Sequence, residues 1–227
     1  MNSPDISFYG MANLIMDGAA LFILAGMFIY TSLYRRRGRV SDKVFFALIL
    51  TDVVAALFNG VIYILDGCDI PFESALYPVC FAVFFLAVDA FALLFCVYQM
   101  YRAQWQESRI RRTLMVLCIA AAILTIFLFV CVFTNNVYTG TIAVGALSIS
   151  VYDILNIVPL IICGVFTVCV TFKQSRQTLI LIALLIVVHV YLTVISVSNV
   201  TPLFLSIYLM YSHLMTMRDS FYGEDAG

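Results

Sequence analysis

The feature that most constrains this chain is the placement of its basic residues relative to seven long apolar runs. All 12 Lys and Arg residues fall in the first, third and fifth gaps between these runs, or after the seventh run. The N-terminal segment and the other three gaps contain no Lys or Arg. In chain order the basic residues are Arg35, Arg36, Arg37, Arg39, Lys43, Arg102, Arg109, Arg111, Arg112, Lys173, Arg176 and Arg218. This alternation predicts seven membrane crossings.

The same alternation predicts the orientation of the chain. Loops rich in Lys and Arg stay on the cytoplasmic side of a membrane. We therefore expect the N-terminus outside and the C-terminus in the cytoplasm. The charged residues on the predicted outer side are all acidic, namely Asp5, Asp66, Asp69 and Glu73.

Composition supports a lipid environment. The chain is 64% hydrophobic and 11% charged, whereas a soluble domain is about 45–50% apolar and about 25% charged. A helix needs about 20 apolar residues to cross the hydrocarbon core. We therefore predict an all-α, polytopic protein of a cell membrane with seven transmembrane helices. The expected spans are 9–34, 42–66, 76–101, 113–134, 148–171, 178–197 and 201–217.

The chain is expected to form one domain. Residues 1–217 would make up the seven-helix transmembrane domain and 218–227 a short cytoplasmic tail, which is too short for a catalytic domain. The sequence contains no metal-binding motif, no nucleophile–base pair at a sensible spacing and no Walker-type loop. We therefore expect no catalytic residue, no metal, no cofactor and no enzyme activity. The basic inner side suits anionic lipid headgroups, and nucleic acid is not expected as a partner.

Ionisable side chains inside the bilayer are the first candidates for a site, because each costs several kcal/mol there. Counting the rise per residue from the span centres places Asp17, Asp52, Asp89 and His189 within about 6 Å of the midplane. One shared polar cluster is therefore possible. Either the aspartates are neutral and hydrogen-bonded between helices, or they form a site for a ligand, a cation or a proton.

A second candidate group lies on the fifth predicted span, where Tyr152, Asp153, Asn156 and Pro159 occur close together. Asp153 and Asn156 are three residues apart and share a helical face. Pro159 frees a backbone carbonyl of the preceding turn and favours a kink. Either the group forms one wall of a ligand-binding site, or Pro159 is an ordinary proline of a transmembrane helix that happens to have polar neighbours.

The seven cysteines show no metal-binding spacing. Cys68 and Cys80 flank the loop between the second and third spans on the predicted outer side. A disulfide between them is possible in an oxidising compartment, and two free thiols are the alternative.

The chain resembles the seven-helix sensor regions that precede output domains in bacterial histidine kinases and diguanylate cyclases. The resemblance lies in the span count, the orientation, the Arg-rich first inner loop and the polar residues of the second and third spans. The stretch Asp219-Ser220-Phe221-Tyr222-Gly223 is also similar to the Asp-x-Leu-Thr-Gly stretch that opens many diguanylate cyclase domains. Phe221 and Tyr222 depart from that pattern.

This resemblance implies a membrane receptor or sensor that binds a small ligand within the helix bundle and signals to a cytoplasmic protein. Expected ligand-binding residues are Asp17, Asp52, Asp89, Tyr152, Asp153, Asn156 and His189. One alternative is a small-molecule or proton-coupled transporter that uses the midplane aspartates. A second alternative is a non-catalytic structural subunit, in which the aspartates only hold helices together.

Overall fold

The computed structural model describes residues 8–34, 40–68, 74–134, 141–144, 147–171, 187–188 and 201–224. Long apolar segments become helical because hydrocarbon supplies no hydrogen-bond partner. The backbone N–H and C=O groups must therefore bond to one another, as they do in a helix. The helices of the described part are α1 (Phe8–Tyr34), α2 (Val40–Gly67), α3 (Leu76–Arg102), α4 (Glu107–Phe133), α6 (Val151–Thr171) and α8 (Thr201–Glu224). The strands are β1 (Thr141–Val144) and β2 (Leu147–Ser150).

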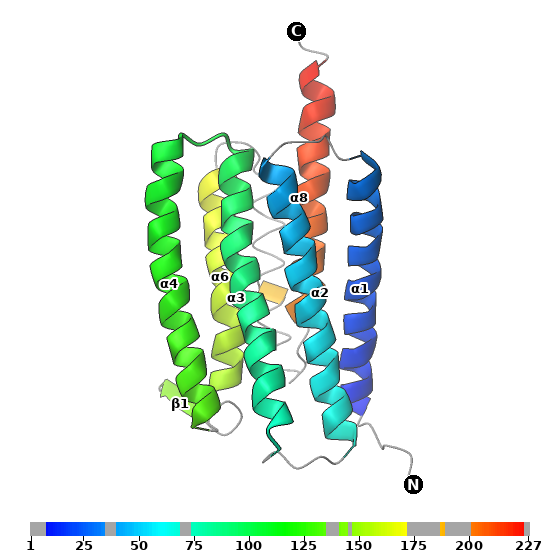
Figure 1. Ribbon diagram of the computed structural model, residues 1–227, viewed down its shortest axis with the longest axis vertical. Coiled ribbons are helices and arrows are strands. Elements are labelled where there is room, and N and C mark those ends of the chain that lie inside the picture. The colour runs from blue at the N-terminus through cyan, green and yellow to red at the C-terminus, as the bar shows by residue number, and fades with distance from the viewer. Residues whose placement is uncertain are drawn as a thin grey trace.

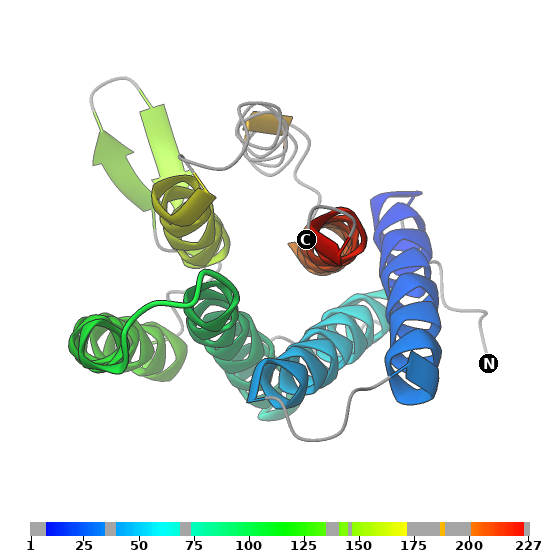
Figure 2. The ribbon, with the colours of Figure 1, turned by 90° about the horizontal axis from the view of Figure 1, so that it is seen from above.

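The helices run lengthwise beside one another in a bundle (Figure 1). Helix α3 packs against α2, α4 and α6, and α8 packs against α1 and α2. Seen from above, α1 and α8 lie beside one end of the α2–α3 pair, and α4 and α6 lie beside the other (Figure 2). Helix α3 therefore joins the two sides of the bundle.

In the part of the chain that the structure describes, four helices are long and apolar enough to cross a membrane, by length and composition. They are Gly10–Leu33, Val40–Gly67, Leu76–Arg102 and Glu107–Val132. The prediction of a helical bundle suited to a membrane is thereby confirmed. The fifth and seventh predicted spans overlap α6 and α8, and within α6 the segment Ile154–Phe166 is a shorter apolar helix. The sixth predicted span, 178–197, lies almost entirely outside the described residues.

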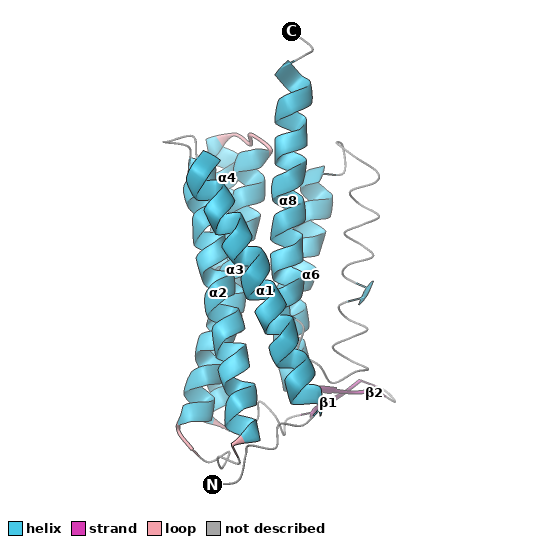
Figure 3. Ribbon diagram, turned by 90° about the vertical axis from the view of Figure 1, so that its right-hand side faces the viewer, coloured by secondary structure: helices cyan, strands magenta, loops and turns pink. Residues whose placement is uncertain are grey.

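The structure differs from the sequence expectation between α4 and α6. The fourth predicted span ends at residue 134 and the fifth begins at residue 148, with no regular element predicted between them. Instead β1 and β2 form an antiparallel hairpin, with Thr141 opposite Ser150 and Val144 opposite Leu147. The β-branched residues of these strands favour extended pairing. The hairpin lies at the end of the bundle opposite to the projecting end of α8 (Figure 3).

The described basic residues gather at one end of the bundle. Lys43 lies in the first turn of α2, Arg102 ends α3, and Arg109, Arg111 and Arg112 lie in the first turns of α4. Successive helices α1 to α4 run in opposite directions (Figure 1), so the end of α3 and the starts of α2 and α4 coincide. We call this the basic end.

A tight turn at the basic end connects α3 to α4. Gln104 has φ 52°, the left-handed conformation that often closes a helix, and the Trp105 backbone N–H donates to the Met100 carbonyl at 3.2 Å. The Arg109 guanidinium carbon lies 3.9 Å from the centroid of the Trp105 ring. The same ring packs against Phe166 of α6, with centroids 5.8 Å apart. Trp105 therefore links α4 to α6 at this end.

Helix α8 does not end where the transmembrane domain was expected to end. A boundary was predicted after residue 217, but the helix continues without a break to Glu224. Its last turns project beyond the other helices (Figures 1 and 3). Residues 218–224, which were predicted as part of a short cytoplasmic tail, therefore continue the helix of the seventh predicted span.

Buried aromatic side chains of α3 form the centre of the hydrophobic core, and large apolar side chains of α1 and α4 face outward. Phe84 is 0% exposed and Phe22 is 82% exposed.

We expect Phe84→Ala to lower the free energy of unfolding by about 3 kcal/mol or more, because it leaves a cavity. The matched variant Phe22→Ala should cost less than about 0.5 kcal/mol. Denaturation of the purified protein in detergent measures both, and equal losses would contradict this packing.

Candidate functional site

Asp17 and Asn59 form a buried hydrogen bond between α1 and α2. The Asn59 amide nitrogen, Nδ2, donates to both carboxyl oxygens of Asp17, at 3.0 Å to Oδ1 and 2.9 Å to Oδ2. Gly60 packs against the same group, because a Cβ at this position would lie 3.8 Å from Asp17 Oδ2 and 3.6 Å from Leu14 Cδ2. Asp17 therefore has a neutral amide partner and serves at least as an interhelical contact.

Asp52 lies deeper in α2 and has no comparable partner. Its side chain is 0% exposed, and neither carboxyl oxygen forms a hydrogen bond to any residue that the structure describes. It lies close enough to Asp17 for two charged carboxylates to repel each other. An unpaired buried charge is costly, so Asp52 must be neutral or must pair with a group from outside the described residues.

Asn13 belongs to this group although the sequence did not single it out. It lies four residues before Asp17 on the same face of α1 and is 1% exposed. Within the described part of the chain, neither its amide oxygen nor its amide nitrogen has a hydrogen-bond partner. Asn13 could have been identified from the sequence, because its side-chain amide lies one helical turn before Asp17 in the same apolar run. A search for ionisable residues alone does not find it.

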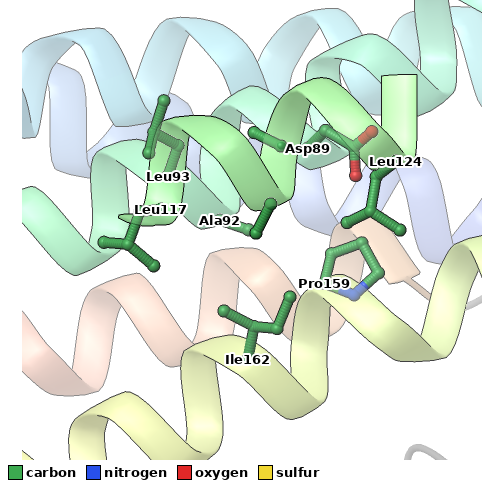
Figure 4. A pocket seen from close by; sticks show the side chains of 9 residues that line it. Asp89, Ala92, Leu93, Leu117, Leu124, Pro159 and Ile162 are labelled. Atoms are coloured by element: carbon green, nitrogen blue, oxygen red, sulfur yellow. The ribbon is translucent and has the colours of Figure 1, made fainter. Parts of the chain in front are cut away.

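Asp89 faces a different part of the bundle. It lines a small cavity between α3, α4 and α6, near Leu124 and Pro159 (Figure 4). Its Oδ2 atom is buried and has no hydrogen-bond partner in the regions that the structure describes. The free space is about 20 Å³, which accommodates about one water molecule. Asp89 is thus the candidate acid that faces open space.

The remaining predicted site residues lie on or beyond α6. Asn156 is buried, and its side-chain oxygen accepts a hydrogen bond at 3.2 Å from the Thr201 hydroxyl of α8. Pro159 lies inside α6 and lines the Asp89 cavity. Tyr152 and Asp153 are in the first turn of α6, but their side chains lie outside the described part, and so does His189 as a whole. The structure thus places Asp52 within electrostatic range of Asp17 and joins Asn156 to α8.

A second polar group, which the sequence did not predict, lies toward the basic end between α3 and α8. The side-chain nitrogen of Gln99 donates to the Ser212 hydroxyl at 3.0 Å, and Arg102 donates to the Ser212 carbonyl at 3.3 Å. The neighbouring His213 stacks on Phe45 of α2, with ring centroids 4.3 Å apart. A buried amide late in an apolar run is the signal that identifies Gln99.

The cysteines and acidic groups offer no metal centre in the described regions. Cys68 is an exposed free thiol after α2, and Cys80 is a buried free thiol on α3. The structure therefore holds the two as thiols, the second of the two states considered for them. No group of three His, Cys, Asp or Glu residues that could hold a metal ion occurs in the described part of the chain.

Comparison with known proteins gives no relative. No protein-family model, no curated protein and no solved structure matches this chain. The features that bear on function are therefore the buried polar groups and the Asn156–Thr201 hydrogen bond between α6 and α8.

The Asp17–Asn59 contact generates a prediction about stability. Asn59→Leu removes both hydrogen bonds and leaves a buried carboxyl group without its donor, which should cost about 1–2 kcal/mol. In an Asp17→Leu background the same substitution should cost much less, because no carboxyl group remains. Unfolding of the four proteins in detergent forms a double-mutant cycle. An equal cost of Asn59→Leu in both backgrounds would show that the contact contributes nothing.

Proposed function

We propose that this chain is an integral membrane receptor or sensor, which binds a small ligand within its helix bundle and signals to a cytoplasmic partner. The observation that supports this most strongly is the Asp89 cavity. The buried Oδ2 atom of its single carboxyl group lacks a hydrogen-bond partner among the described residues, and one of the cavity walls is α6. A small molecule that supplies the missing partner would contact α3, α4 and α6 at once.

A route from this cavity to the basic end follows from the polar contacts of α8. Pro159 and Ile162 of α6 line the cavity, and Asn156 of the same helix bonds to Thr201 at the start of α8. Further along α8, Ser212 is held by Gln99 and Arg102 of α3. A ligand that moves α6 relative to α3 would thus change the position of α8. Two states that differ by a few kcal/mol suffice for such a response.

The proposal includes seven spans, an outer N-terminus and a cytoplasmic C-terminus. The gathering of the described basic residues at one end supports this orientation. In it, the projecting part of α8 and the exposed side chains of Lys43, Arg109, Arg111 and Arg112 would be on the cytoplasmic side. This surface would be available to a signalling protein and to anionic lipid headgroups.

Asp52 favours one alternative function, a proton-coupled or small-molecule transporter. A fully buried carboxyl group without a partner in the described regions, close to Asp17, is a suitable group to take up and release a proton. In contrast, the Asp17–Asn59 bond fits the third possibility, a structural subunit, because it satisfies the carboxyl group with a neighbouring helix.

Orientation can be tested with cysteine labelling. In a variant with Cys68→Ser and Cys118→Ser, we expect Ala75→Cys to react with a membrane-impermeant maleimide on intact cells. Ser108→Cys should react only after permeabilisation. Both positions are exposed. Ala75 directly precedes α3, and Ser108 lies in the first turn of α4, at the opposite end of the bundle. Labelling of Ser108→Cys on intact cells, with Ala75→Cys protected, would reverse the proposed orientation.

Proton flux separates a receptor from a proton-coupled transporter. In proteoliposomes that contain a pH-sensitive dye, a receptor should give no more proton flux than empty liposomes under an imposed pH gradient. Flux through the wild-type protein that is lost in Asp52→Asn and Asp89→Asn would overturn the receptor proposal. Asp66→Asn is the matched control, because Asp66 is exposed near the end of α2 and should leave any flux unchanged.

A further inference from the structure

We propose that the cavity between α3, α4 and α6 binds an organic cation, specifically the ammonium group of a small alkylamine, with Asp89 as its counter-charge. This inference rests on the proposed receptor function and names the chemical class of the ligand. It follows from the charge, polarity and size of the cavity and from the backbone at Pro159.

The charge of the ligand follows from the sequence around the cavity. The segments 44–101 and 113–172, which contain nearly all of α3, α4 and α6, have no Lys or Arg. Asp89 Oδ2 is buried and has no hydrogen-bond partner in the described part of the chain. The three helices that form the cavity therefore provide no basic side chain from their apolar segments. A cationic ligand would provide the counter-charge, whereas an anion would be repelled.

The polarity of the walls restricts the ligand further. Apart from Asp89, the cavity is lined by apolar residues, including Leu117, Leu124, Pro159 and Ile162. A sugar or another molecule with many hydroxyl groups would leave most of them without partners, and each unpaired group costs free energy. One charged group attached to an apolar chain matches a site with one carboxyl group and apolar walls.

The size of the cavity limits what can reach the carboxyl group. The free space of about 20 Å³ holds about one water molecule, and an ammonium group is of similar size. The rest of the ligand must therefore extend along the apolar walls. On its outer face α4 exposes large apolar side chains such as Met115, Ile119 and Ile123, so a membrane-dissolved amine is a suitable form of ligand.

The backbone at Pro159 offers a candidate second acceptor for the ammonium group, the carbonyl of Leu155. A proline has no backbone N–H, so the Leu155 carbonyl one turn earlier loses its normal helical donor. Pro159 lines the cavity, and this carbonyl belongs to the same region of α6. An ammonium group has three N–H donors, so it could bond to Asp89 and to a freed carbonyl at the same time.

The test uses the full chain in lipid nanodiscs, with n-butylammonium chloride as the probe. We expect butylammonium to raise the thermal unfolding midpoint of the wild-type protein in a saturable manner, whereas n-butanol and NaCl at equal concentration should not. Asp89→Asn should weaken butylammonium binding at least about 30-fold, because it removes one partner of a buried charge pair. Asp66→Asn is the matched control and should bind as the wild type does.

A second pair of variants keeps the proposal testable if Asp89→Asn fails to fold. Ala120 lines the cavity, whereas Ala122 is exposed on the same helix. Ala120→Leu should fill the cavity and abolish the response to butylammonium, and Ala122→Leu should retain it. An unchanged response in Asp89→Asn or Ala120→Leu would overturn the proposal. So would an equal response to butanol or to NaCl.

Failure of the amine site and failure of the receptor proposal give different combinations of results. If butylammonium does not bind and the proteoliposomes show no proton flux, the amine site is rejected and the receptor proposal stands with another ligand class. If butylammonium binds through Asp89 and flux is lost in Asp52→Asn and Asp89→Asn, the amine site stands and the receptor proposal is rejected.

Discussion

Hydrocarbon offers no hydrogen-bond partners, and this constraint governs both the backbone and the buried side chains of the bundle. It makes the apolar runs helical. It also favours hydrogen bonds between buried polar side chains of neighbouring helices. Asp17 forms such a bond with Asn59, Asn156 with Thr201, and Gln99 with Ser212. The first bond joins the consecutive helices α1 and α2, whereas the other two join α8 to α6 and to α3.

Helix α3 has a central part in this arrangement because it packs against α2, α4 and α6. Asp89 on this helix lines the cavity, and Gln99 near its end holds α8. One rigid helix therefore connects the candidate ligand site with the helix that projects at the basic end (Figure 1). In the proposed receptor, a ligand would act on α6 and α3 together, and the position of α8 would report the change.

Much of the bundle could be predicted from the sequence, and particular residues show where such prediction ends. The first three predicted spans agree with α1, α2 and α3 to within two residues at each end, because hydrophobic length is a strong signal. The fourth span began six residues late, since the charged first turns of α4 lie outside the apolar run. The β1–β2 hairpin was missed because β2 resembles the start of the fifth apolar span, and β1 falls in the loop expected before that span. Asn13, Gln99 and His213 do not stand out in the sequence, because an uncharged polar side chain costs less in an apolar run than a charged one and is therefore a weaker signal.

The sequence by itself determined the helical class, the apolar lengths, the end at which basic residues collect and the position of each aspartate along its apolar run. Only the tertiary structure decided that Asp17 meets Asn59, that Asp52 has no partner among the described residues and that Asp89 faces a cavity. The physical reason is that residue count gives the depth along a helix but not its rotation. In lipid, a side chain that faces outward and one that faces a neighbouring helix are both apolar. Rotation is therefore set by packing between helices, which only the folded bundle shows.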